Sequence, residues 1–270
     1  MVIEPVLIRR KHRTDTIFID EFEEKKCIEY ILNCYRTPLG RKKARQMLTA
    51  AILITGTELG VQIIKKFLRR GLDDEEIEEL RDINELPSWI TSQKAFSVLK
   101  KGFVPVLETL HKEARRHQPS DTEERILTLK NLFDLNSTET ELLSLFYLRT
   151  VSAVVEYLFD EAIDFSRVDL CRNFVGFLIG KGKEEVRQAL RSGRLFDGYL
   201  LELEDRNIHL SEGIQNYISG IGNDDIGAEF FEVFRGDTIP IREFSVPEEE
   251  MSLLVTLLEI SRGCNLLFYG

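Results

Sequence analysis

Glycine and lysine alternate at residues 180–183, in the sequence GKGK, a composition that phosphate-binding loops also use. A P-loop needs four residues between its first glycine and its Gly-Lys pair, and a Ser or Thr after the lysine. Here only three residues separate Gly176 from Gly180, and Gly182 follows Lys181. The spacing therefore argues against a P-loop and favours a turn between two helices.

Other residue types that could do chemistry do not form a recognisable site. His111 and His117 lie six positions apart, so they do not share a helical face as a zinc-binding His-x-x-x-His pair would. Cys27 and Cys34, seven positions apart, fit one face of a helix, and we expect small core residues there. The chain has no Gly-x-Ser-x-Gly elbow. We assign no catalytic residue and no metal ligand.

Composition describes an ordinary globular protein. The 270 residues are 43% hydrophobic and 30% charged, and the net charge is −10. This acidity argues against a protein that coats nucleic acid with its whole surface, although a local basic face remains possible. No stretch approaches the roughly 18 apolar residues that span a bilayer, so we expect no membrane partner. The four scattered cysteines suggest reduced thiols in the cytoplasm.

Residues 1–120 are expected to form a helical domain. Apolar residues recur at helical spacing over 20–35, and a nearly continuous apolar run predicts one or two buried helices, broken around Gly56 or Gly60. Asp73 and Asp74 can cap an acidic helix ending near Asn84. A helical stretch over 89–117 follows, in which Pro105 should kink or divide the helix. The polar, proline-containing stretch 115–124 then marks a domain boundary.

Residues 121–221 predict a different arrangement. Thr138-x-x-Glu141 is a capping-box pattern before an apolar helix, and three further helices follow, the last over 183–193 with Val186 and Leu190 inward. Two strand-like runs, 199–203 and 207–210, then flank a turn, and a helix over 211–220 closes the segment. Helix, short turn, second helix and β-hairpin is the order of a winged helix. We therefore expect a winged-helix-like domain over 121–221.

In a DNA-binding winged helix, the helix over 183–191 would enter the major groove. Glu184 and Glu185, the acidic chain and a hairpin with only Arg206 as a basic residue oppose that role. We therefore favour contact with a protein over contact with DNA. The residues that could contact a partner or DNA phosphates are Lys181, Lys183, Arg187, Arg191 and Arg194.

The last residues combine a helix with a buried-type strand. Acidic residues and prolines mark a linker over 222–247, and a helix opening with Pro247 precedes the apolar run NLLFY and Gly270. An apolar strand followed by glycine is how a P-loop begins. The stretch FSVPEEEMSLLVTLLEISRGCNLLFYG (244–270) resembles the start of the nucleotide-binding core of AAA family ATPases. Residues 130–221 also look like the winged-helix segment upstream of the core in some bacterial AAA proteins.

The resemblance implies a mainly α N-terminal region of an AAA ATPase, with residues 248–270 supplying the first helix and strand of an α/β core. Gly270 would be the first glycine of a Walker A loop that the 270 residues do not complete, so we expect no ATP hydrolysis by this segment alone. ATP and Mg²⁺ would bind the full-length parent, which would form a homo-oligomeric ring and remodel a protein client or adaptor. The alternatives are a winged-helix DNA-binding regulator without ATPase activity and a purely helical protein-interaction scaffold.

Overall fold

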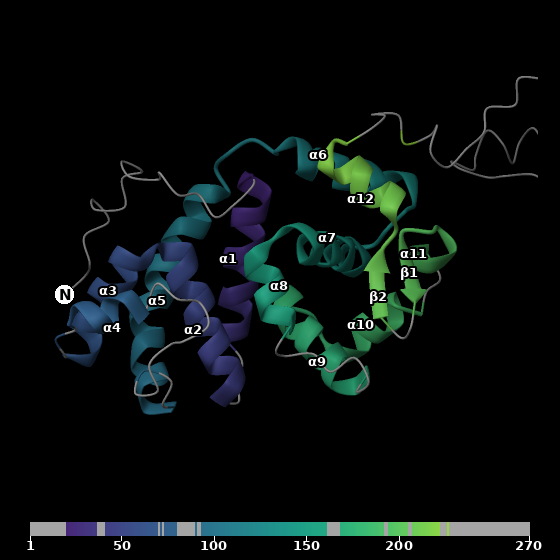
Figure 1. Cartoon of the computed structure of the whole chain (residues 1–270). Coiled ribbons are helices and arrows are strands. Elements are labelled where there is room, and N and C mark those ends of the chain that lie inside the picture. The colour runs from purple at the N-terminus through teal and green to yellow at the C-terminus, as the bar shows by residue number, and fades with distance from the viewer. Residues whose placement is uncertain are drawn as a thin grey trace, which may run out of the picture. The chain divides into compact units, whose positions relative to one another are not determined.

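The computed structural model describes residues 20–36, 41–69, 71, 73–79, 90, 93–160, 168–191, 194–204, 207–221 and 226. These residues are mainly helical and contain one two-stranded antiparallel sheet, as the sequence predicts for a mainly α chain (Figure 1). Residues 1–226 form one compact unit, and residues 227–270 form a second. Apart from Ile226, the predicted linker, the predicted strand 265–269 and Gly270 lie outside the described residues.

Helix α1 (Glu21–Tyr35) lies at the centre of the first unit, packed against α2, α5 and α9 (Figure 1). The Asp20 side chain accepts from the Glu23 N–H at 2.8 Å and so caps the helix. Because neighbours surround it, α1 buries Lys26 as well as its apolar residues. Cys27 and Cys34 are fully buried, which confirms the prediction of core cysteines.

Helices α2 (Arg41–Thr55) and α3 (Thr57–Leu68) confirm the predicted break, which falls at Gly56. The φ angle of Gly56 is 82°, a conformation that glycine adopts without the steric cost of a Cβ atom. Helix α3 then packs closely on α5, since a Cβ atom on Gly102 would lie 2.6 Å from Ile63. The small residue therefore sets the spacing between these two helices.

Helix α4 (Asp74–Glu79) begins with the cap that the sequence predicts. The Asp73 carboxylate accepts from the Glu76 N–H at 2.8 Å, and the Glu76 carboxylate accepts from the Asp73 N–H at 3.3 Å. Helix α5 (Gln93–Ala114) continues through Pro105, so the proline does not divide the helix, and the predicted alternative of a kink stays a prediction. Proline removes one backbone hydrogen bond, but Phe103 and Leu107 on either side are fully buried, and their packing holds the helix together.

Helices α6 (Asp121–Leu132), α7 (Ser137–Val151) and α8 (Ala153–Asp160) follow. The predicted capping box at Thr138 and Glu141 is wrong, because α7 begins two residues earlier. Asn136 is the N-cap, and its side chain accepts from the Glu139 N–H at 3.0 Å while Glu139 accepts from the Asn136 N–H at 2.8 Å. Glu141 is thereby free to bind Lys26 of α1, with its two oxygens 2.6 and 2.7 Å from Nζ.

The remaining elements follow the predicted order, with one short helix, α11, that the sequence does not predict. Helices α9 (Val168–Ile179), α10 (Lys183–Ala189) and α11 (Arg194–Asp197) precede strands β1 (Leu201–Glu204) and β2 (Asn207–Leu210), and α12 (Glu212–Ser219) comes last. The strands pair antiparallel, with Leu201 opposite Leu210 and Glu204 opposite Asn207. This register confirms the predicted antiparallel hairpin.

The domain boundary that the sequence places near residue 120 stays a prediction, but described residues on its two sides pack together. Lys25 of α1 binds Glu123 of α6 at 2.6 Å, and the Cys27 thiol lies 3.5 Å from the Ser152 hydroxyl before α8. The Asn33 amide donates to the Leu178 carbonyl of α9 at 2.9 Å. Helix α1 therefore connects the earlier helices to the segment that carries the hairpin.

Candidate functional site

The predicted turn between α9 and α10 depends on two glycines. Gly180 has a φ angle of 67°, and the Lys181 N–H donates to the Gly176 carbonyl at 2.8 Å, which closes the end of α9. A Cβ atom on Gly176 would lie 2.7 Å from the Lys181 carbonyl oxygen, so the chain doubles back directly over this residue. The GKGK segment is therefore a helix–helix turn among the described residues, as the sequence predicts.

Helix α10 follows this turn and presents one buried face. The Glu185 carboxylate accepts from the Gly182 N–H at 2.9 Å at the start of the helix. Val186 and Ala189 are buried where α10 packs against α9 and α7. Val186 confirms the predicted inward position, whereas Leu190 at the helix end is only partly buried. The other face of α10 is left for polar side chains.

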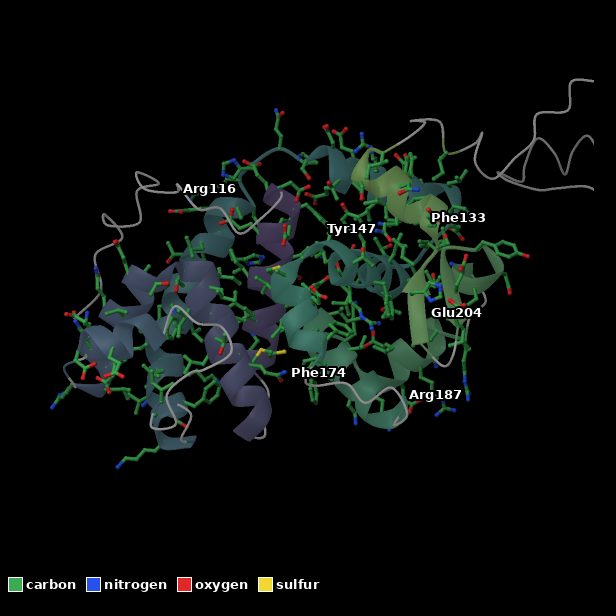
Figure 2. All side chains as sticks on the ribbon, in the orientation of Figure 1. Arg116, Phe133, Tyr147, Phe174, Arg187 and Glu204 are labelled. Carbon is green, nitrogen blue, oxygen red and sulfur yellow. The ribbon has the colours of Figure 1, made fainter. Side chains whose placement is uncertain are left out.

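The predicted basic contacts are only partly available to a partner. The Lys181 ammonium lies 3.3 Å from the Ser137 hydroxyl, and the Arg187 guanidinium lies 3.3 Å from the Glu184 carboxylate. Lys183 is half-buried, and Arg191 is exposed. In Figure 2, Arg187 lies below Glu204 of the hairpin.

Arg194, the fifth predicted contact, is part of the internal structure. Its guanidinium donates to the Asp134 carbonyl, and it lies 3.7 Å from the Asp134 carboxylate. It also lies 3.5 Å from the carboxylate of Glu139, which is fully buried. Arg194 thus ties α11 to the loop between α6 and α7. Its capacity to bind an external anion is correspondingly reduced.

The hairpin carries an acidic face that the sequence analysis did not identify. Glu202 and Glu204 alternate along β1, so both point to one face of the sheet, and His209 lies opposite Glu202. The His209 Nε2 atom is 3.3 Å from Glu202 and 4.0 Å from Glu204. The alternation in LELE (201–204) is the signal that could have predicted this face. Carboxylates at this position would repel a phosphate backbone.

The opposite face of the hairpin is apolar, and only part of it is buried in the core. Leu201 and Leu210 are buried at its base, whereas the Leu203 side chain is 65% exposed. Tyr199, just before β1, is 70% exposed and has a φ angle of 52°, which is uncommon for a residue with a side chain. Large exposed apolar side chains near each other, here one on β1 and one just before it, are typical of a surface that contacts another protein.

The described part of the chain offers no other site. It contains no group of three or more His, Cys, Asp or Glu side chains placed to hold a metal ion. Its helices are all too short or too polar to cross a membrane. Gly270, the predicted nucleotide contact, lies outside the described residues. Comparison with protein-family models, with curated proteins and with solved structures finds no match.

Proposed function

We propose that the surface formed by α10 and the hairpin recognises a protein, and that the chain is the partner-recognition region of an AAA-type ATP-binding protein. The charge arrangement at this surface supports recognition of a protein. Arg194 and Arg187 contact carboxylates of their own chain, and the hairpin adds Glu202 and Glu204. A DNA-binding surface needs the opposite arrangement, with basic side chains available to phosphates.

We further propose that α9, α10 and the hairpin form a winged helix used for protein contact. Two features support this assignment. A tight turn joins α9 to α10, and an antiparallel hairpin follows within the same compact unit. Winged helices serve protein interactions as well as DNA binding, so the arrangement is compatible with the charge distribution.

The ATPase part of the proposal rests on the resemblance of residues 244–270 to the start of an AAA core. In this proposal, ATP and Mg²⁺ bind a core in the full-length parent, which assembles as a homo-oligomeric ring. Hydrolysis then moves the recognition region and remodels the bound protein client or adaptor. The test is the coding sequence after Gly270: seven residues that complete x-x-x-x-Gly-Lys-Ser/Thr support the proposal, and any other continuation overturns it.

The recognition part is tested by binding to a fluorescent DNA duplex, measured by anisotropy at low salt and again at raised salt. We expect no binding at either salt concentration. Salt-dependent binding that is lost in Arg187→Ala/Arg191→Ala would overturn the proposal in favour of a DNA-binding regulator. The matched control is Lys65→Ala/Lys66→Ala, which removes two exposed charges from α3, far from α10 in sequence. Equal loss in both variants would indicate non-specific attraction.

A further inference from the structure

The hydrogen bonds of the hairpin show which backbone groups each strand leaves for another partner. Directly opposed residues in an antiparallel pair alternate between exchanging hydrogen bonds and pointing their N–H and C=O groups away from each other. The Ser211 N–H donates to the Leu200 carbonyl at 3.1 Å, so the backbone groups of this opposed pair face each other. By this alternation, the backbone groups of Glu202 and His209, two positions further along, also face each other, and the N–H and C=O groups of Leu203 and Ile208 point away from the partner strand.

The two outer edges of this sheet have different surroundings. On β2, the outward carbonyl of Ile208 accepts from the Arg149 guanidinium of α7 at 3.2 Å, so α7 covers that edge. On β1, no described residue makes a hydrogen bond to the outward N–H or C=O of Leu203. An open strand edge of this kind is a template for pairing with another strand, and proteins commonly protect such edges with Lys or Pro. Here the edge position is an exposed leucine.

We propose that the outer edge of β1 binds an extended segment of a partner protein as a third strand. This inference rests on the proposed function and specifies the chemistry of the partner. Side chains of an added strand alternate between the two faces of the sheet. On one face they meet Glu202 and Glu204, and on the other they meet Leu203. The segment that fits alternates Lys or Arg with apolar residues such as Val or Ile.

Charge distinguishes this partner from a second copy of the same chain. Pairing β1 with β1 of another copy would place four carboxylates on one face, and like charges on neighbouring strands are destabilising. The Glu204 side chain is 81% exposed and Glu202 is half-exposed, so both are accessible to basic side chains. The chain as a whole carries a net charge of −10, which favours approach of a basic segment. A basic and apolar strand therefore complements both faces.

The probe is a fluorescent peptide, Lys-Val-Lys-Val-Lys-Val, whose binding to the whole chain is measured by anisotropy. Two peptides serve as controls: Lys-Lys-Lys-Val-Val-Val, which keeps the charge but loses the alternation, and Glu-Val-Glu-Val-Glu-Val, which reverses the charge. We expect the alternating basic peptide to bind about tenfold more tightly than either, as two cross-strand charge pairs would produce. Equal binding of the scrambled peptide would overturn the inference, because general attraction to an acidic protein would explain it.

Two variants test the edge itself. Leu203→Pro removes the outward N–H and the exposed side chain while leaving the inward hydrogen bonds of β1, so peptide binding should fall at least tenfold. Glu202→Lys/Glu204→Lys should transfer the preference to the Glu-Val peptide, a gain that misfolding cannot produce. Unchanged preference in this double variant would overturn the inference. If no peptide binds while duplex DNA also fails to bind, only the strand inference falls. Duplex binding through Arg187 and Arg191 overturns the proposed function itself.

Discussion

The ion pair between α1 and α7 gives the sharpest stability prediction. The Lys26 ammonium lies 2.6 and 2.7 Å from the two oxygens of Glu141, and its side chain is only 9% exposed. Glu141→Gln keeps the side-chain shape but leaves the buried ammonium with Glu29, 3.3 Å away, as its remaining carboxylate partner among the described residues. The change should therefore destabilise the fold by more than the loss of a surface pair.

The magnitude lies between two limits. Exposed ion pairs contribute less than about 1 kcal/mol, whereas breaking a fully buried pair costs about 3–5 kcal/mol. The pair is largely but not fully buried, and Glu29 offsets part of the loss, so we expect about 2 kcal/mol for Glu141→Gln. Lys26→Met should cost about 1 kcal/mol, because the two carboxylates left behind can reach water. The double variant should cost about 1–2 kcal/mol less than the sum of the two.

The assay is urea unfolding at neutral pH, followed by circular dichroism. The control is Glu184→Gln, which removes the partner of Arg187 in an exposed pair on α10 and should cost less than about 0.5 kcal/mol. A Glu141→Gln variant that is no less stable than Glu184→Gln would show that the buried pair contributes no more than an exposed one. Strictly additive effects of Lys26→Met and Glu141→Gln would also contradict the prediction, since they would show that the two groups do not interact.

The Lys26–Glu141 pair also predicts how the stability of the fold depends on pH. Burial alone lowers the pKa of Lys26, but the carboxylates of Glu141 and Glu29 outweigh it, so the pKa lies above its ordinary value of 10.5. The folded state thus binds this proton more tightly than the unfolded chain does. Its stabilisation is complete below pH 10.5 and is lost as the pH rises through the folded-state pKa. The stability difference between the native chain and Lys26→Met should therefore narrow as the pH rises through that alkaline range.

Three further predictions concern the interior. In the same urea titration, Gly176→Ala should destabilise the fold by more than about 2 kcal/mol, because its Cβ atom would meet the Lys181 carbonyl at 2.7 Å. The control Gly71→Ala, with open space around the added Cβ atom, should be nearly neutral. Thr49→Val should stabilise the fold by about 1 kcal/mol in thermal unfolding, because the buried Thr49 hydroxyl has no hydrogen-bond partner among the described residues. Cys27 should resist maleimide labelling in the native state and react in urea, since burial raises the pKa of its thiol. Peptide mass spectrometry measures the labelling, and labelling of the native state would contradict this burial.

Local features of the fold could be predicted from sequence, because each depends on few neighbouring residues. Gly56 ends a helix since glycine adopts positive φ angles freely, and Asp73 caps α4 through its own side chain. The hairpin follows from two strand-like runs separated by a short turn. These signals involve spans of a few residues, and the structure confirms them.

Features that depend on distant residues could not be predicted in the same way. Thr138 and Glu141 matched a capping pattern, but Glu141 is used by Lys26, which lies 115 positions away in the chain. The sequence predicts Arg194 as a contact for a partner or DNA, but the structure places the buried Glu139 carboxylate beside its guanidinium. In both cases the residue type was recognised, but its partner came from tertiary packing. Which edge of the hairpin α7 covers likewise depends on tertiary packing: it covers β2, and among the described residues nothing bonds to the outward backbone groups of Leu203 on β1.

The central claim is that the surface of α10 and the hairpin binds protein and not nucleic acid. Amide chemical-shift mapping of the isotope-labelled chain tests it most directly, with the Lys-Val peptide and a DNA duplex added in separate titrations. We expect the peptide to shift the amides of residues 201–204 and the duplex to shift none on α10. Duplex-induced shifts concentrated on residues 183–191, with no response of the hairpin to the peptide, would contradict it.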